Sequence, residues 1–70
     1  MKTVTINKQP VELYKILKFE GLVTTGGEAK LLNGDGQVTV NGTIETQRRK
    51  KIVAGDVIGF RGDTLLIALS

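Results

Sequence analysis

The stretch TTGGEAKLLNGDGQVTVNGTIETQRRKK, residues 24–51, decides how this chain folds. Thr25 and Glu28 have the spacing of a capping box, in which the threonine hydroxyl accepts from the amide of Glu28 and the carboxylate accepts from the amide of Thr25. We therefore predict a helix over residues 26–33, ended by the next two glycines. A helix this short depends on packing rather than on intrinsic propensity.

A change in the apolar period marks the end of this helix and the start of a hairpin. Val38 and Val40 would face one side of a strand, and Ile44 would continue the return strand. Asn41-Gly42 between them is a strong signal for a two-residue turn, because both positions need positive φ angles. We interpret Asn41 and Gly42 as structural, since turn geometry alone explains them.

The residues before this stretch predict one strand and one helix. Residues 2–7 alternate, which indicates a short half-buried strand with Val4 and Ile6 on its inner side. Pro10 is expected in the first turn of the following helix, where its missing amide hydrogen would have no partner. This helix would end at Gly21 and would bury one apolar face formed by Leu13, Ile16 and Leu17.

The residues after the stretch supply the remaining strands. Gly55-Asp56 and a turn at 61–63 separate three apolar segments, at 52–53, 57–60 and 65–69. Asp56 is interpreted as structural, anchoring its turn through the neighbouring backbone. No repeat, linker or low-complexity segment interrupts the pattern, so we predict one α+β domain covering residues 1–70.

The composition removes several classes of function. The 70 residues include no cysteine and no histidine, which excludes disulfides, thiolate metal sites and the usual general base. The seven carboxylates therefore have no evident catalytic partner, and TGGEAK lacks the spacing of a phosphate-binding loop. We expect no catalytic residue, no metal, no cofactor and no small-molecule substrate.

The net charge points to a polyanionic partner. The formal charge is +3 and the pI is near 9.5, a balance that favours RNA, DNA or another anionic surface. No apolar run approaches the roughly 20 residues needed to span a bilayer, and no charged leader precedes a signal segment. We expect a cytoplasmic monomer that does not contact membranes.

Arg48-Arg49-Lys50-Lys51 is the strongest charge signal in the chain. Four adjacent positive charges repel one another unless they splay into solvent or meet an anion. In an extended segment the side chains would alternate, so that about half of them would face a single RNA surface. The alternative is a solubilising segment that protects the edge of a hairpin. We favour the RNA role.

Three motifs, in this order, resemble a known family, the RNA-binding domain named for ribosomal small-subunit protein four (the S-four domain). They are the acidic-Ala-basic helix start Glu28-Ala29-Lys30, the G-x-V-x-V-N-G pattern of residues 36–42, and the G-D-x-I pattern of residues 55–58. The resemblance covers residues 11–60, and small stand-alone bacterial members of the YbcJ type are the most similar. It implies the alpha-L fold, in which two short helices pack on a small, mainly antiparallel sheet, here with a short N-terminal strand. It also implies RNA binding through the helix pair and the adjoining hairpin.

Some residues depart from the family pattern. Glu12 and Gly26 stand where the family usually has arginines, and Tyr14 stands where it has an aspartate. Two customary phosphate or base contacts are therefore missing, and the positive charge must come from elsewhere. The candidate RNA-binding residues are Lys15, Lys18, Gly26, Gly27, Lys30, Arg48, Arg49, Lys50 and Lys51.

Lys30 combines family position with local physics. It lies near the start of the second predicted helix, where free amides and the helix dipole suit a phosphate oxygen. Gly26 and Gly27 would let a nucleic-acid backbone approach closely. The alternative is a solvated lysine that pairs with Glu28 or Asp35.

The other candidates carry weaker signals. Lys15 and Lys18 are neighbours on one helix face, and an ordinary polar face explains them as well as contact with RNA does. We expect Phe19 and Phe60 in the core, whereas Tyr14 fits either the core or a base-stacking role.

Taken together, these residues predict a non-catalytic protein that binds structured RNA, ribosomal or transfer. The alternative is a protein-interaction module associated with the ribosome or another RNA-processing complex.

Overall fold

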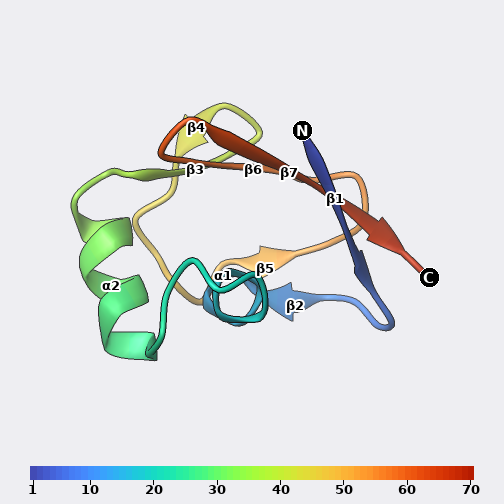
Figure 1. The fold of residues 1–70 in the computed structure, drawn as a ribbon, viewed down its shortest axis with the longest axis horizontal. Helices are drawn as coiled ribbons and strands as arrows, with labels where there is room; N and C mark the ends of the chain where they lie inside the picture. The colour runs from blue at the N-terminus through green and yellow to red at the C-terminus, as the bar shows by residue number, and fades with distance from the viewer.

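Five strands pair into one sheet, and two short strands pair beside it (Figure 1). The computed structural model describes residues 1–70. The elements in chain order are β1 (Lys2–Ile6), β2 (Val11–Glu12), α1 (Leu13–Phe19), α2 (Gly26–Gly34), β3 (Val38–Val40), β4 (Thr43–Ile44), β5 (Lys51–Ile52), β6 (Val57–Phe60) and β7 (Asp63–Leu69).

The larger sheet has the strand order β1-β7-β6-β3-β4, and within it only β1 and β7 are parallel. The smaller sheet pairs β2 with β5 in antiparallel orientation. Both helices and the β2–β5 pair lie on one side of the larger sheet (Figure 1). The predicted α+β fold with a mainly antiparallel sheet is therefore confirmed. Neither helix is long and apolar enough to cross a membrane.

The core lies between the helices and the larger sheet and contains fifteen buried apolar side chains. Val4 and Ile6 of β1 point into it, as do Val38 and Val40 of β3, so the predicted alternation is confirmed. The predicted inner face of α1 is also confirmed, since no part of Leu13, Ile16 or Leu17 is exposed.

The prediction that Phe19 lies in the core is wrong. Its side chain is 77% exposed, whereas Phe60 is buried as expected. An α-helix turns by about 100° per residue, so a residue two positions beyond Leu17 points to the opposite side of α1. Tyr14, which the sequence left open, is half-buried and packs against the core.

The first helix starts later than the sequence suggests. Pro10 lies outside α1, because Val11 and Glu12 are extended and pair with Ile52 and Lys51 of β5. A proline is equally tolerated ahead of a strand, and only the long-range pairing separates the two possibilities. The predicted end at Gly21 is confirmed: this residue has φ +73°, and its amide donates to the carbonyl of Lys18 (3.0 Å).

One of the two hydrogen bonds predicted for the capping box of the second helix is confirmed. Thr25 Oγ1 accepts from the amide of Glu28 (3.1 Å), and α2 starts at Gly26. The carboxylate of Glu28 accepts from the amide of Thr24 (3.1 Å) rather than from that of Thr25. The helix runs through Gly34, one residue further than predicted.

Turn residues join the antiparallel strands as the sequence indicates. Asn41 (φ 54°) and Gly42 (φ 84°) form the two-residue turn between β3 and β4. Arg61 (φ 49°) and Gly62 (φ 87°) form a second one, so that β7 already begins at Asp63.

The structural interpretation of Asn41 and Asp56 is also supported by their hydrogen bonds. Asn41 Nδ2 donates to Asp56 Oδ1 (3.1 Å), and Asn41 Oδ1 accepts from the amide of Val57 (3.0 Å). The second carboxylate oxygen of Asp56 accepts from the amide of Val53 (3.0 Å). These bonds fasten the hairpin tip to the turn before β6.

Candidate nucleic-acid interface

The segment between β4 and β5 brings the basic run against α2. The side-chain amide of Asn33 donates to the carbonyl of Glu45 (2.7 Å), and the guanidinium of Arg48 donates to the carbonyl of Gly26 (3.2 Å). Residues 45–48 therefore run alongside α2, from its last turn toward its first. Figure 1 draws this segment between the two helices.

The same segment also caps α1. The amides of Leu13 and Tyr14 donate to the carbonyls of Lys50 and Arg48, both at 2.9 Å. These are amides of the first turn of α1, which have no acceptor within their own helix. The basic run is thus held by hydrogen bonds beside the first turns of both helices.

The prediction of an extended, alternating basic run is wrong. The Lys50 amide donates to the carbonyl of Gln47 (3.2 Å), so Arg48 and Arg49 lie in a turn, and only Lys51 belongs to a strand. The amides of Leu13 and Tyr14 at the start of α1 use two carbonyls of this segment as acceptors. In an extended segment these two carbonyls would lie too far apart to reach two neighbouring amides. Arg48 is half-buried, and its guanidinium is partly used to hold the turn against α2.

Lys30 is an exposed residue of α2, four positions after Gly26 and three before Asn33. Residues three and four positions apart share a helix face, so the spacing puts Lys30 on the same face as the two attachment points. Neither Glu28 nor Asp35 forms an ion pair with Lys30, because the only ion pairs join Lys2 to Glu20 and Lys15 to Glu12. We call the surface formed by Lys30, Arg48, Arg49 and Lys50 the basic corner; Arg48 is half-buried and the other three side chains are exposed.

The start of α2 adds hydrogen-bond donors to the basic corner. The amides of Gly26 and Gly27 donate to no protein acceptor, while the next amide, that of Glu28, is capped by Thr25. A methyl group at Gly26 would meet nothing within 4 Å, and one at Gly27 would meet only Thr25 Oγ1 at 3.8 Å, so no other segment crowds these two positions. Free amides at a helix N-terminus suit an anion.

The remaining predicted residues flank the basic corner. Lys15 and Lys18 are exposed on the outer face of α1, and Lys15 lies 3.7 Å from the carboxylate of Glu12. Glu12 is also paired across β2 and β5 with Lys51, the last residue of the basic run. The structure therefore places Lys15 and Lys51 together at the β2–β5 end of α1, and it places Lys18 in the last turn of that helix.

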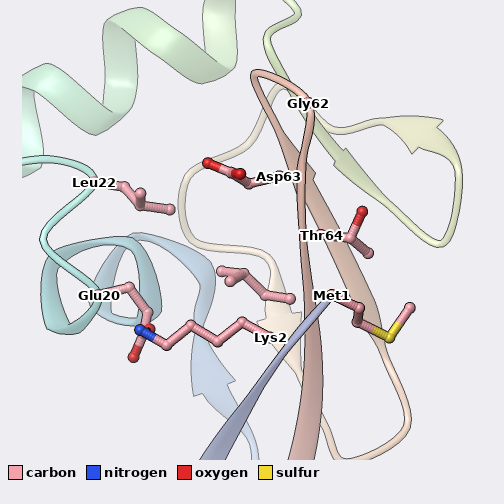
Figure 2. A pocket seen from close by; sticks show the side chains of 8 residues that line it. Met1, Lys2, Glu20, Leu22, Gly62, Asp63 and Thr64 are labelled. Carbon is pink, nitrogen blue, oxygen red and sulfur yellow. The ribbon is translucent and has the colours of Figure 1, made fainter.

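A hollow at the N-terminal end of β1 has no free lysine or arginine for a phosphate. It measures about 430 Å³ and is lined by eight residues, among them Lys2, Glu20 and Asp63 (Figure 2). Lys2 Nζ lies 2.6 Å from Glu20 Oε1, so the one lysine of this hollow is already paired. No group of three or more histidine, cysteine, aspartate or glutamate side chains is placed to hold a metal ion.

Asn33 has a role that the sequence did not predict. Its side chain is fully buried, on the same face of α2 as Ala29 and Leu32, and it fixes the path of the segment that carries the basic run. The signal was present in the sequence, because a polar residue stands where the helical period expects an apolar one.

Comparison with known proteins agrees with this architecture. The family model of the S4 domain, which is the S-four domain named above, matches residues 4–68. The Escherichia coli (strain K12) protein named "Putative RNA-binding protein YbcJ" is 43% identical over 68 residues, covering 96% of this chain and 97% of that protein. The Bacillus subtilis (strain 168) protein named "Probable ribosome maturation protein RlbA" is 29% identical over 59 residues, covering 84% of this chain and 83% of that protein.

A solved structure shows the same fold. The solution structure of YbcJ from E. coli, described as revealing an alpha-L motif involved in RNA binding, has a TM-score of 0.72 and 42% sequence identity to this chain. The match covers 97% of this chain and 87% of that one. With the family model spanning nearly all of its residues, the chain belongs to the S4 domain family.

Proposed function

We propose that this protein is a non-catalytic RNA-binding module that holds structured RNA against the basic corner. The observation that carries the proposal is the pair of hydrogen bonds from Asn33 to Glu45 and from Arg48 to Gly26. They attach the basic run to α2, the helix that carries Lys30 and the free amides of Gly26 and Gly27. The name of the E. coli relative supports RNA as the partner, and the name of the B. subtilis relative supports an association with the ribosome.

The chemistry of the basic corner suits phosphates at fixed spacing. Arg49 can grip a phosphate with two parallel hydrogen bonds, whereas Lys30 and Lys50 act as point charges. The amides of Gly26 and Gly27 add donors that cannot move. Tyr14 is half-buried and Phe60 is buried, so the basic corner has no exposed aromatic ring of its own. A cationic surface without such a ring favours the backbone of structured RNA over unpaired bases.

RNA binding by the basic corner is expected to depend strongly on the salt concentration. We expect the affinity for a structured RNA hairpin to fall steeply as salt rises, because each neutralised phosphate releases counterions. The four cations of the basic corner would give a slope of about −2.8 to −3.6 in log affinity against log salt concentration. Fluorescence anisotropy of a labelled hairpin over a salt series measures this slope. A slope near zero, or no binding at low salt, would contradict the proposed function.

A second prediction tests the amides of α2. Gly26→Ala adds a methyl group in open space at a position without positive φ, so we expect the fold to be unchanged or stabilised by about 0.4–1 kcal/mol. The methyl group would hinder a phosphate resting on the free amides, and we expect the RNA affinity to fall about fivefold, which corresponds to a weakened hydrogen bond of roughly 1 kcal/mol.

Gly34→Ala is the matched control for this test. Its methyl group also meets nothing within 4 Å, but it lies at the far end of the same helix. Thermal unfolding and RNA titration of both variants separate the two effects. Equal RNA affinities of the two variants would show that no phosphate approaches the start of α2.

A further inference from the structure

A groove of about 760 Å³ runs between β1 and α1. Four consecutive residues of β1, Thr3 to Ile6, line it. Consecutive residues of a strand point to opposite faces, so the groove is bordered by the edge of β1 rather than by one of its faces. That edge is unpaired, because β7 is the only neighbour of β1 in the sheet.

Phe19 lies on the α1 wall of this groove with its side chain 77% exposed. Burial of a phenylalanine side chain stabilises a structure by about 1.5–3 kcal/mol. Because Phe19 is exposed, the fold of this protein does not gain that stabilisation. Lys15 lines the groove one helical turn earlier, on the same side of α1. The ring and the cation therefore face the same space.

Two of the three lysines that line the groove form no ion pair. Lys8, Lys15 and Lys51 line it together with two glutamates. Glu20 is paired with Lys2, which lies outside the groove lining, and Glu12 is paired with Lys15. Lys8 forms no ion pair, and Lys51 forms none either, although Glu12 is its neighbour across the β2–β5 pair. An exposed aromatic ring beside unpaired cations is the combination that binds single-stranded nucleic acid.

The groove begins where the basic corner ends, since Lys51 directly follows Lys50 in the chain. We propose that it takes an unpaired nucleotide of the RNA, with Phe19 stacked on the base and with Lys8 and Lys51 at the phosphates. This inference rests on the proposed function, because the paired part of the same RNA would lie on the basic corner. The open edge of β1 is also compatible with an acidic peptide that adds a strand. The exposed ring and the continuity with the basic corner favour RNA.

The experiment compares two RNA hairpins with the same stem, one blunt and one with a short unpaired extension that carries 2-aminopurine. We expect the wild-type protein to bind the extended hairpin more tightly and to quench the 2-aminopurine fluorescence by stacking. Phe19→Ala should lower the affinity for the extended hairpin about 5- to 150-fold and should abolish quenching. Its affinity for the blunt hairpin should stay unchanged. Phe19→Tyr, which keeps an aromatic ring, should behave like the wild type.

The outcomes distinguish failure of the groove from failure of the proposed function. If Phe19→Ala binds the extended hairpin as tightly as the wild type, the groove proposal is overturned, and binding to the blunt hairpin still supports the basic corner. If neither hairpin binds, both proposals fail. A third outcome, in which a poly-glutamate peptide and not RNA shifts the amide resonances of Thr3 and Thr5, would assign the groove to a protein partner and overturn the RNA assignment.

Discussion

Reversing the charge of Arg49 and Lys50 together is expected to lower the affinity for structured RNA about 150-fold or more. Both side chains are exposed, and neither forms an ion pair within the protein. Loss of two charge-assisted hydrogen bonds, each worth about 1.5–3 kcal/mol, accounts for a decrease of this size before any repulsion is added. We also expect the salt slope to become shallower by about 1.5 to 2, since two phosphate contacts are removed.

The Arg49→Glu/Lys50→Glu variant leaves Arg48 in place because that guanidinium holds the turn against α2. The matched control is Arg61→Glu, a charge reversal at the turn between β6 and β7, where Arg61 bonds with Gln37 just beyond the C-terminal end of α2. We expect the control to lose only a modest, nonspecific part of the affinity. The double variant reverses two charges and the control reverses one, so a loss of log affinity in the control that is half of the loss in the double variant would show that net charge, rather than the basic corner, drives binding.

The Asn33→Ala substitution is expected to lower the free energy of unfolding by about 1–2 kcal/mol. It removes a fully buried side chain and leaves the half-buried carbonyl of Glu45 without its donor. The lost hydrogen bond costs about 0.5–1.5 kcal/mol and the lost packing adds to this, whereas removal of Asn33 Oδ1, which is buried without a hydrogen-bond partner, offsets part of the cost. The segment that carries the basic run would also be less firmly held, so we expect weaker RNA binding even where the variant is fully folded.

Thr43→Ala is the control, because Thr43 is exposed, its side chain forms no hydrogen bond, and it lies outside both the basic corner and the groove beside β1. Chemical denaturation measures the stability of both variants, and RNA titration well below the unfolding transition measures binding. If Asn33→Ala is as stable as the control, the bond to Glu45 does not hold the segment. If it is destabilised but binds RNA with wild-type affinity, the position of the basic run does not depend on Asn33.

Local signals in the sequence predicted most of the fold. Thr25 and Glu28 fixed the start of α2, and Asn41-Gly42 fixed the first hairpin, because these motifs act over a few residues and need no distant partner. The alternation around Val38 and Val40 placed the inner side of β3 correctly. The errors fall where distant segments meet: Pro10 lies ahead of a strand because β5 pairs with β2, and the basic run turns because α1 needs its carbonyls.

The sequence predicted which types of residue form the candidate interface. It did not predict how these residues are arranged on the surface. Composition and the run Arg48-Arg49-Lys50-Lys51 indicated an anionic partner, since charge is a property of the residues themselves. The exposure of Phe19 depends on where α1 starts and on which of its sides meets the sheet. The sequence contains no direct measure of either.

The cap of α2, the two-residue turn at Asn41-Gly42 and the net charge thus follow from the sequence alone, because each depends on neighbouring residues or on a simple count. The position of Arg48 beside the start of α2 and the exposure of Phe19 in a groove depend on tertiary packing. Those arrangements depend on the hydrogen bonds of Asn33 and Arg48 to residues 12 and 22 positions away in the chain. Contacts over such separations form only when the whole core has packed.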